Sequence, residues 1–504
     1  MRSTWDLQRF SNILVQALSL SQVKEELQMQ AKILTPIVFT SLLMYSRTTI
    51  SMLFLGHQGK LQLAGGSLAI GFANITANSI LKGLTMGMDS ICAQAYGAQR
   101  WSLLSQTLLK TISLLLLVSI PISLLWLNIT PILLWLGQDP QVTHIAQIYL
   151  LFSIPELLAQ ACLNPLRVFL RTQNLNFALT LSASVSSFLH LPLNYFLAVY
   201  LNLGVKGVAL ATGLNSLNMI LGLLVYLLVS DKPIKPWEEL GLGGGSSSFL
   251  LCVFQNWKPL LSLALPSCLS VCLEWWWYEI MLFLCGLLSN PQTTIATMGI
   301  LIQTCGFLYV FPFSLSSALT IRIGHSLGAG EACGAQRAAI VGMVTAFTFG
   351  VTACVVLVSV RGFWGRMFTS ERQIVELVRS TLPILGLGEI GNWPQTASCG
   401  ILSGTSRPYV GARINLCAFY LIGLPVSLIA SFVYGFGFEG LWYGMVAAQI
   451  SCFCMMVYAF LRTDWRHHSR KTKMEMELAL QVPNNLHKQE INNENDDEES
   501  KLIN

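Results

Sequence analysis

The stretch TLLKTISLLLLVSIPISLLWLNI, residues 107–129, contains a single charged side chain, Lys110. A helix must offer roughly 20 mostly apolar residues to cross the hydrocarbon layer of a membrane. About twelve stretches of this kind can be marked along the chain, at residues 33–55, 68–92, 107–129, 145–163, 177–200, 205–229, 261–285, 293–315, 338–360, 378–400, 412–434 and 440–461. Because backbone polar groups in lipid need partners within the protein, we expect every stretch to be an α-helix.

Composition and charge also indicate a membrane protein. Hydrophobic residues make up 53% of the chain and charged residues only 11%, which leaves too few polar side chains for an ordinary water-exposed surface. Lys and Arg collect in alternate loops and in the run from Arg462 to Lys473, although Arg361, Arg366 and Arg372 lie against this bias. The balance predicts that both termini face the cytoplasm. The net charge of +5 therefore reflects membrane orientation, and we expect no nucleic-acid partner.

The order of the spans divides the chain into five parts. We expect a cytoplasmic N-terminal segment (1–32), an N-lobe (33–229), a cytoplasmic linker (230–260), a C-lobe (261–461) and a largely disordered cytoplasmic tail (462–504). The run GLGGGSSS at 241–248 is typical of a flexible linker. The end of the tail is rich in Asn, Glu and Asp, which permits binding of cytoplasmic proteins. The thirteen cysteines form no CxxC pair, so we expect neither a metal nor a cofactor.

An internal repeat relates the two predicted lobes. AYGAQR at 95–100 corresponds to SLGAGE at 326–331, and LGVKG at 203–207 corresponds to FGFEG at 436–440. The interval is roughly 230 residues in both cases. Each half holds an even number of spans, so the halves insert with the same orientation and should be related by an axis along the membrane normal. The predicted fold is an all-α polytopic membrane protein with two pseudo-symmetric six-helix lobes and a substrate site between them.

Several motifs make the chain resemble the multidrug and toxic compound extrusion (MATE) transporters, and among them the plant DETOXIFICATION group. The motifs are LAGGSLAIGFANIT (63–76), MGMDSICAQAYGAQ (86–99), CLEWWWYE (272–279), GILSGTSRP (400–408) and RTDW (462–465). The resemblance covers about residues 31–463. It implies a V-shaped fold and export of a small organic solute, such as a hormone, organic acid or secondary metabolite, driven by an ion gradient. Plasma, endosomal and vacuolar membranes are all compatible with it.

The resemblance assigns proton coupling to an acid in the seventh helix, which corresponds to Glu274. A carboxylate near the bilayer centre costs about 2.5 to 3.5 kcal/mol on insertion scales, so it is usually retained for a function. Counting along the helices places Glu389 at a similar depth from the opposite face. Because a low-dielectric environment favours the neutral carboxyl, both acids are candidates to bind and release protons. A hydrogen-bonded structural role within the lobe is the alternative for each.

The chain departs from the family pattern at two positions. Many plant relatives carry an acid in the tenth helix where this chain has Thr396. Glu389 lies seven residues earlier on nearly the same helical face and is a candidate to replace it. Bacterial relatives carry a first-helix Asp where this chain has Ser51, so the resemblance disfavours a carboxylate or sodium site in the N-lobe.

Weaker candidates for the substrate cavity are polar or aromatic residues within the spans: Arg47, Asn74, Asn194, Trp277 and Thr396. Arg47 could meet an anionic substrate or form a structural ion pair within the N-lobe. The two asparagines could instead bond neighbouring helices, and the tryptophan could instead pack a helix. Lys82 and Asp89 also lie within the early spans, where charges normally face protein or water.

The sequence thus favours a proton-coupled antiporter in which protonation of Glu274 shifts the balance between outward-open and inward-open states. A transporter-like signalling or adaptor protein, acting through its tail, is the alternative. A membrane enzyme is disfavoured, because the seven His residues are scattered and no metal-ligand or nucleophile cluster is evident.

Overall fold

The computed structural model describes residues 19–236 and 256–478, and in these ranges the chain is built from helices and short connections. The N-terminal half contains α2 (Leu20–Gln58), α3 (Lys60–Ala73), η1 (Asn74–Asn78), α4 (Ser79–Gly97), α5 (Trp101–Leu127), α6 (Ile129–Trp135), α7 (Pro140–Thr172), α8 (Asn176–Asn194), η2 (Tyr195–Tyr200) and α9 (Val205–Val229). The C-terminal half contains α12 (Lys258–Cys285), α13 (Pro291–Gly328), α14 (Ala332–Val360), η3 (Trp364–Met367), α15 (Arg372–Gly404), α16 (Pro408–Asn415), η4 (Leu416–Gly423), α17 (Leu424–Leu428), η5 (Ile429–Val433) and α18 (Gly437–Leu461).

Consecutive helical segments join into long rods, so that α3, η1 and α4 form one rod and α16 to η5 form another. Ten of the twelve predicted spans lie within one helix or rod, while 107–129 runs past the end of α5 into α6 and 412–434 ends one residue beyond η5. The all-α membrane fold is confirmed. Within the described ranges, nine helical stretches, among them the rod Pro408–Val433, are long and apolar enough to cross a membrane. The rods α3 to α4 and α8 to η2, and the helix α15, are not among these nine.

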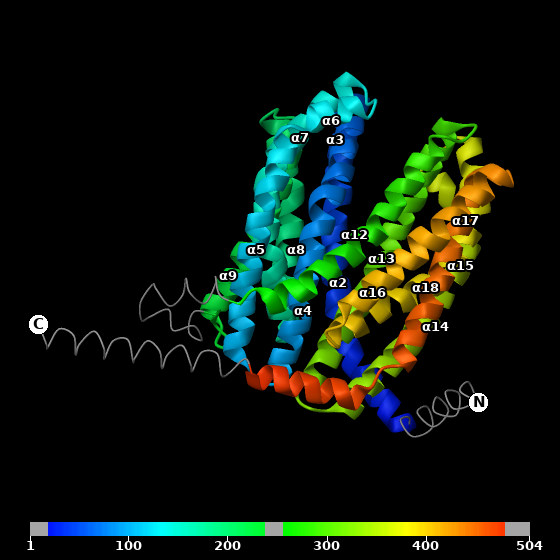
Figure 1. Cartoon of the computed structure of the whole chain (residues 1–504). Helices are drawn as coiled ribbons and strands as arrows, with labels where there is room; N and C mark the ends of the chain where they lie inside the picture. The colour runs from blue at the N-terminus through cyan, green and yellow to red at the C-terminus, as the bar shows by residue number, and fades with distance from the viewer. Residues whose placement is uncertain (1–18, 237–255, 479–504) are drawn as a thin grey trace, which may run out of the picture.

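The rods form two lobes that diverge at one end and meet at the other (Figure 1). We call the end where they meet, which contains the start of α2 and the end of α18, the closed end. At the closed end the lobes exchange short segments. Leu260 and Ala264 of α12 join the N-lobe core, whereas Ile37 of α2 packs against Ala318 and Ile321 of α13. The predicted C-lobe therefore starts at residue 261 along the chain, but the first turns of α12 pack in the hydrophobic core of the N-lobe.

Glycines allow the lobes to approach closely at the closed end. A Cβ atom on Gly87 of α4 would lie 2.5 Å from the Cα of Ala264 in α12, and one on Gly83 would lie 2.6 Å from the Cα of Cys268. Nearer the end, Gln94 donates its side-chain amide to the carbonyl of Gly404 at 2.9 Å. Glycine is needed at these places because any side chain would meet backbone of the other lobe.

A further helix follows α18 at residues 465–478 and lies across the closed end beneath both lobes (Figure 1). We call it the transverse helix. Asp464 begins it by accepting a hydrogen bond from the backbone N–H of His467 at 3.0 Å, and this bond lowers the pKa of Asp464. One face is buried through Trp465, Ser469, Thr472 and Met476. The spacing of these residues follows the helical repeat.

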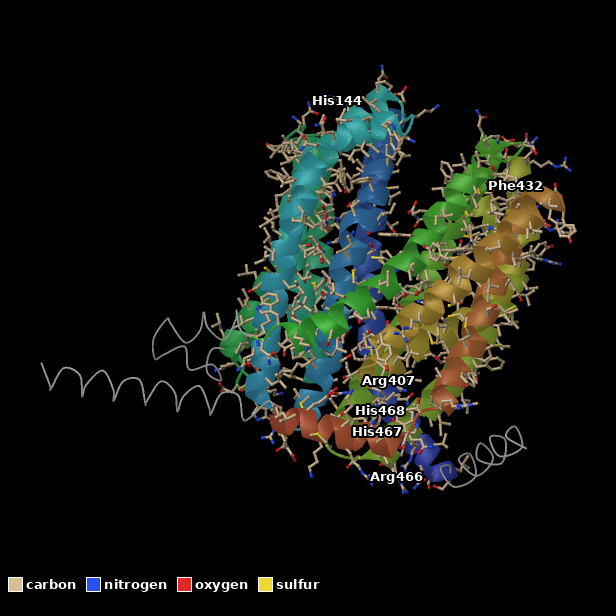
Figure 2. All side chains as sticks on the ribbon, viewed as in Figure 1. His144, Arg407, Phe432, Arg466, His467 and His468 are labelled. Carbon is tan, nitrogen blue, oxygen red and sulfur yellow. The ribbon has the colours of Figure 1, made fainter. Side chains whose placement is uncertain are left out.

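Arg466 and His467 on the transverse helix are exposed, whereas His468 is half-buried and lies near Arg407 (Figure 2). Arg407 also donates to the hydroxyl of Thr463 at 2.8 Å. The first part of the predicted tail is therefore an ordered helix, anchored by the buried Trp465. The predicted linker run at 241–248, residues 1–18 and residues 479–504 lie outside the described residues.

Candidate functional site

Glu274 lies on α12 in the C-lobe, where three helices enclose its carboxylate. Gln395 of α15 directs its side-chain amide at the carboxylate from 3.5 Å, and Tyr309 on α13 is also a neighbour of this carboxylate. Gln395 is held in turn by Asn415, whose Oδ1 lies 3.4 Å from Nε2. The side chain of Glu274 is therefore buried and contacted by neutral donors.

Glu389 lies on α15, a little farther from the closed end, and is also buried. Asn392 donates its side-chain amide to the carboxylate at 3.1 Å. A cavity of about 10 Å³ adjoins it, with Tyr278 and Gln449 among its lining residues. Gly391 permits this arrangement, because a Cβ atom there would lie 3.0 Å from the backbone of Gln449 on α18. Both polar atoms of the Gln449 amide are buried without a partner in the described chain.

Thr396 links the surroundings of the two acids. Its hydroxyl lies 3.5 Å from Oδ1 of Asn392 and 3.3 Å from Oε1 of Gln395. Polar side chains on one face of α15 thus run from Glu389 through Asn392, Thr396 and Gln395 to Glu274. The two acids are also close enough for their charges to interact. The structure therefore brings together the predicted proton-coupling pair and Thr396.

Glu274 and Glu389 differ from the other buried acids of the described chain because no arginine or lysine forms an ion pair with them. Within the described residues, the buried acids besides Glu274 and Glu389 are Asp89 and Glu26, and each has an arginine partner. Asp89 lies 2.8 Å from Arg171, and Glu26 lies 3.0 Å from Arg322. No Lys or Arg of the described chain lies within 4.0 Å of the carboxylate of Glu274 or Glu389. These two acids can accept a proton without breaking an ion pair.

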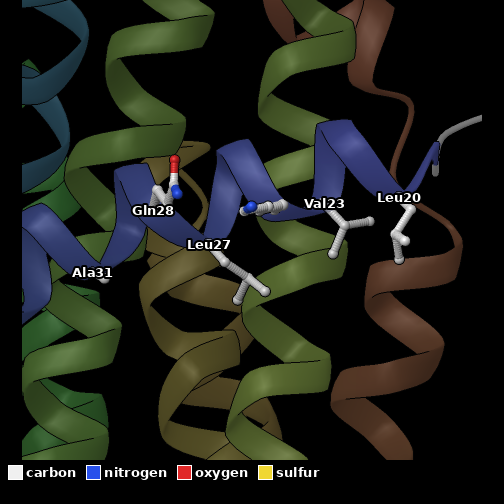
Figure 3. A pocket seen from close by; sticks show the side chains of 6 residues that line it. Leu20, Val23, Leu27, Gln28 and Ala31 are labelled. Carbon is white, nitrogen blue, oxygen red and sulfur yellow. The ribbon is translucent and has the colours of Figure 1, made fainter.

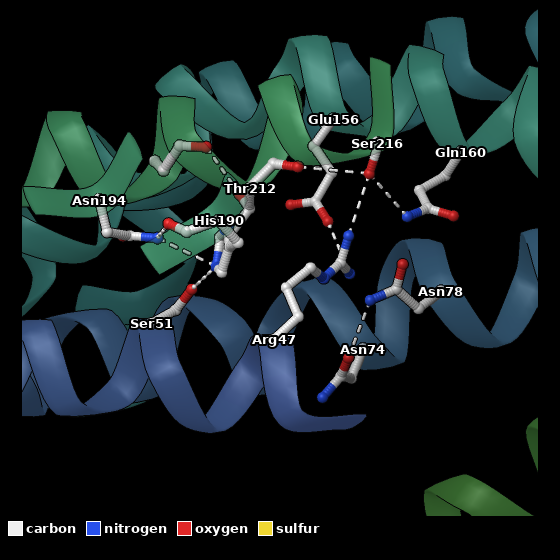
Figure 4. A network of polar contacts seen from close by, with 11 residues as sticks. Arg47, Ser51, Asn74, Asn78, Glu156, Gln160, His190, Asn194, Thr212 and Ser216 are labelled. Carbon is white, nitrogen blue, oxygen red and sulfur yellow. Dashed lines mark hydrogen bonds and ion pairs between the residues drawn. The ribbon is translucent and has the colours of Figure 1, made fainter. Parts of the chain in front are cut away.

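Arg47 belongs to a polar network inside the N-lobe (Figure 4). Its guanidinium lies 3.1 Å from the carboxylate of Glu156 on α7 and donates to the hydroxyl of Ser216 at 3.0 Å. Gln160 donates to the same hydroxyl at 3.1 Å. Sequence reasoning missed Glu156, although an acid inside the predicted span 145–163 was a sufficient signal. The ion pair matches the structural alternative for Arg47.

Asn194 lies in a second part of this network, beside His190 on α8 (Figure 4). The amide nitrogen of Asn194 lies 3.0 Å from Nε2 of His190, and the hydroxyl of Ser51 lies 3.1 Å from the same ring nitrogen. His190 and Asn194 are fully buried. Ser51, which occupies the place of the acid found in bacterial relatives, therefore faces a histidine. No sequence motif marked His190, because a lone histidine in a span has no spacing pattern.

The remaining cavity candidates differ in exposure. Asn74 accepts a hydrogen bond from the exposed Asn78 at 2.8 Å and is itself half-buried in η1. Trp277 is fully buried and packs against Phe419, with ring centroids 5.7 Å apart. It therefore packs the C-lobe core and does not face the space between the lobes.

Two other features lie away from the acids. A surface hollow of about 470 Å³ is lined by Leu20, Val23, Leu27 and Ala31 on the first turns of α2 (Figure 3). Lys24 and Gln28 complete its lining, and none of the lining residues belongs to the site of the two acids. In residues 19–236 and 256–478, no group of three His, Cys, Asp or Glu side chains could hold a metal ion.

Comparisons with known proteins agree in family and fold. A sequence model of the MatE family matches residues 36–196 and 266–429. Protein DETOXIFICATION 53 of Arabidopsis thaliana is 55% identical over 452 residues, which cover 90% of this chain and 91% of that protein. Protein DETOXIFICATION 48 of the same plant is 49% identical, covering 91% of this chain and 84% of that protein. The crystal structure of the eukaryotic MATE transporter AtDTX14 aligns with a TM-score of 0.84 at 29% identity, covering 90% of this chain and 99% of that chain.

Proposed function

Because this chain belongs to the MatE family of membrane transporters, we propose that it exports a small organic solute in exchange for protons by alternating access. Glu274 and Glu389 are the proton-binding groups of this proposal. The observation that carries it is the absence of a cationic partner within 4.0 Å of either buried acid in the described chain, whereas Asp89 and Glu26 are ion-paired. An acid with neutral hydrogen-bond partners can change its protonation state at moderate cost, since no ion pair in direct contact is broken.

The contacts of Glu274 suggest how protonation changes the C-lobe. An ionised carboxylate only accepts hydrogen bonds, so it orients the Gln395 amide and the Tyr309 hydroxyl as donors. A protonated carboxyl also donates, which permits the Gln395 side chain to turn its oxygen toward Glu274. That change would pass to Thr396 and Asn392, which share the same chain of hydrogen bonds. Protonation of one acid would thereby alter the surroundings of the other.

Glu274→Gln tests the proton-coupled mechanism, because the amide keeps the shape of the side chain and loses the titration. Radiolabelled hormones, organic acids and flavonoids are first screened in proteoliposomes with an imposed pH gradient. We expect the variant to insert normally and to lose gradient-driven transport. Glu279→Gln is the matched control, since it makes the same substitution on the same helix at a half-buried acid. Unchanged gradient-driven transport by Glu274→Gln would contradict the proposal.

We further propose that both termini face the cytoplasm, in the plasma membrane or in an endosomal or vacuolar membrane. The basic residues of the closed end support this orientation, among them Arg466, Arg470 and Lys471 on the exposed side of the transverse helix. Epitope tags at either end should be protected from an impermeant reagent on intact cells, and labelling there would refute the orientation. A fluorescent fusion imaged in plant cells would identify the membrane.

A further inference from the structure

Lys82 of the N-lobe is surrounded by aromatic rings of the C-lobe. It lies near the start of α4, and its ammonium nitrogen is 3.8 Å from the ring centroid of Phe313, 5.0 Å from that of Trp275 and 5.9 Å from that of Tyr309. Phe313 and Tyr309 belong to α13, and Trp275 belongs to α12. A cation over an aromatic face is attracted by the ring quadrupole, most strongly where water is partly excluded. Lys82 therefore attracts the opposite lobe through three side chains.

The charges around Lys82 strengthen this attachment to the C-lobe. Arg167 and Arg171, both on α7 of its own lobe, repel the ammonium, and Glu274 of the C-lobe attracts it. Arg171 is already paired with Asp89 at 2.8 Å. In the described chain, no carboxylate lies within 4.0 Å of the Lys82 nitrogen. Its attractive neighbours thus all lie across the boundary between the lobes.

We propose that Lys82 is a positioning residue that holds the two lobes together at the closed end while Glu274 is ionised, and lets them separate when Glu274 binds a proton. This inference rests on the proposed function, because it takes Glu274 as the proton site. Opening of the closed end must draw α4 away from α12 and α13. That movement removes the ammonium from three rings and from Glu274 at the same time.

The charged and polar groups around Glu274 and Lys82 determine whether protonation of Glu274 favours or opposes separation of the lobes. The side chains that contact the Glu274 carboxylate, Gln395 and Tyr309, are neutral hydrogen-bond donors, and the nearby acid Glu389 is negative when ionised. Lys82 is the cation that acts on Glu274. Once Glu274 is neutral, the repulsion from Arg167 and Arg171 on Lys82 is no longer opposed by a negative charge across the boundary. Protonation thus favours separation at the closed end, the step that an inward-moving proton must drive in an antiporter.

The distance between the lobes at the closed end gives a direct test that needs no substrate. Spin labels are attached to the exposed Cys333 at the start of α14 and to an introduced cysteine at the exposed Asn174, in a background with the other cysteines replaced. In the wild-type background, we expect lower pH to increase the population with a long inter-label distance. Lys82→Met should raise the ratio of separated to closed protein on the order of tenfold at neutral pH. It should also reduce the response to pH, while Lys82→Arg keeps both close to wild type.

Two further variants make the outcome decisive. Lys206→Met is the matched control, because Lys206 lies 5.6 Å from the ring centroid of Phe152 within one lobe, so its loss should not alter the distance. Phe313→Leu removes the nearest ring without changing a charge, and should increase separation even if Lys82→Met fails to fold. Wild-type distances and pH response in well-folded Lys82→Met or Phe313→Leu would overturn the inference. Lost proton-driven transport in Glu274→Gln, together with that result, would leave the proposed function standing without the role of Lys82.

Discussion

The contact of Gly87 with α12 predicts that a single methyl group will weaken the closed end. In Gly87→Ala, the added Cβ would lie 2.5 Å from the Cα and backbone nitrogen of Ala264 and 2.8 Å from its Cβ. Ordinary contacts between carbon atoms lie at about 3.5 to 4.0 Å, so the two helices must move apart by roughly 1 Å. Backbone cannot turn aside as a flexible side chain can.

The size of the effect follows from the cost of overpacking. Inserting a methyl group into a close-packed contact typically costs about 1 to 3 kcal/mol. If separation of the lobes relieves the whole overlap, the ratio of separated to closed protein rises by roughly 5-fold to 150-fold. Alanine also favours a helix over glycine by about 1 kcal/mol, which stabilises both states alike and does not shift their ratio.

The measurement is the distance between spin labels at Asn174 and Cys333, one on each lobe at the closed end. We expect Gly87→Ala to move the distribution toward the separated population at every pH. Gly71→Ala is the matched control in the same helical rod, because no atom lies within 4 Å of its added Cβ, and it should leave the distribution unchanged. A closed distribution in Gly87→Ala, with wild-type thermal stability, would refute the reasoning.

Three further predictions follow from individual contacts. Asp89→Asn should lower the stability by about 3 to 5 kcal/mol, because it leaves Arg171 buried without its carboxylate; a melting temperature equal to wild type in detergent would contradict this. Glu389→Gln should move the pH profile of transport to lower pH, since one of two mutually repelling carboxylates is removed, whereas Thr396→Ala should change it much less; an unshifted profile in well-expressed Glu389→Gln would exclude coupling. Burial and the nearby Arg407 lower the pKa of His468 to about 4. Because neutral His468 is favoured in the docked helix, its contribution is present above the ordinary pKa near 6.5 and is lost as pH falls toward 4. Hydrogen exchange in residues 465–478 should therefore accelerate over that range and less so in His468→Gln.

The sequence marked Glu274 and Glu389 of the C-lobe and Asp89 of the N-lobe, but the N-lobe acid Glu156 was not named. Glu274 was found because it stands within a motif that is specific to a family, and Glu389 because it lies at a similar depth in a long apolar span. Glu156 stood in a span as well, but its spacing gave no hint that Arg47 lies opposite. The two residues are far apart in the chain and meet because α2 and α7 both pack against α9, whose Ser216 also bonds Arg47.

Lys82 and Trp277 also show that the sequence does not reveal which side chains of a span face the opposite lobe. Both lie in apolar spans, and the sequence offered Trp277 as a residue that could meet a solute. The structure buries Trp277 against Phe419 and instead surrounds Lys82 with rings from the other lobe. A rotation of α12 by one residue, about 100°, would exchange which of its tryptophans faces α4. The local sequence of α12 does not predict this rotation about the helix axis.

The sequence by itself determined that the chain crosses the membrane many times as helices, that it is built from a repeat, and that it belongs among the MATE transporters. These properties depend on the number of consecutive apolar residues and on motif order, because lipid cannot satisfy an exposed backbone and so permits few alternatives. The tertiary structure alone decided which charges are paired, how segments of α2 and α12 pack against the opposite lobe, and that Lys82 lies among aromatic rings of the C-lobe. These depend on helix rotation and on close contacts such as that of Gly87 with Ala264, which are set by packing between residues far apart in the chain.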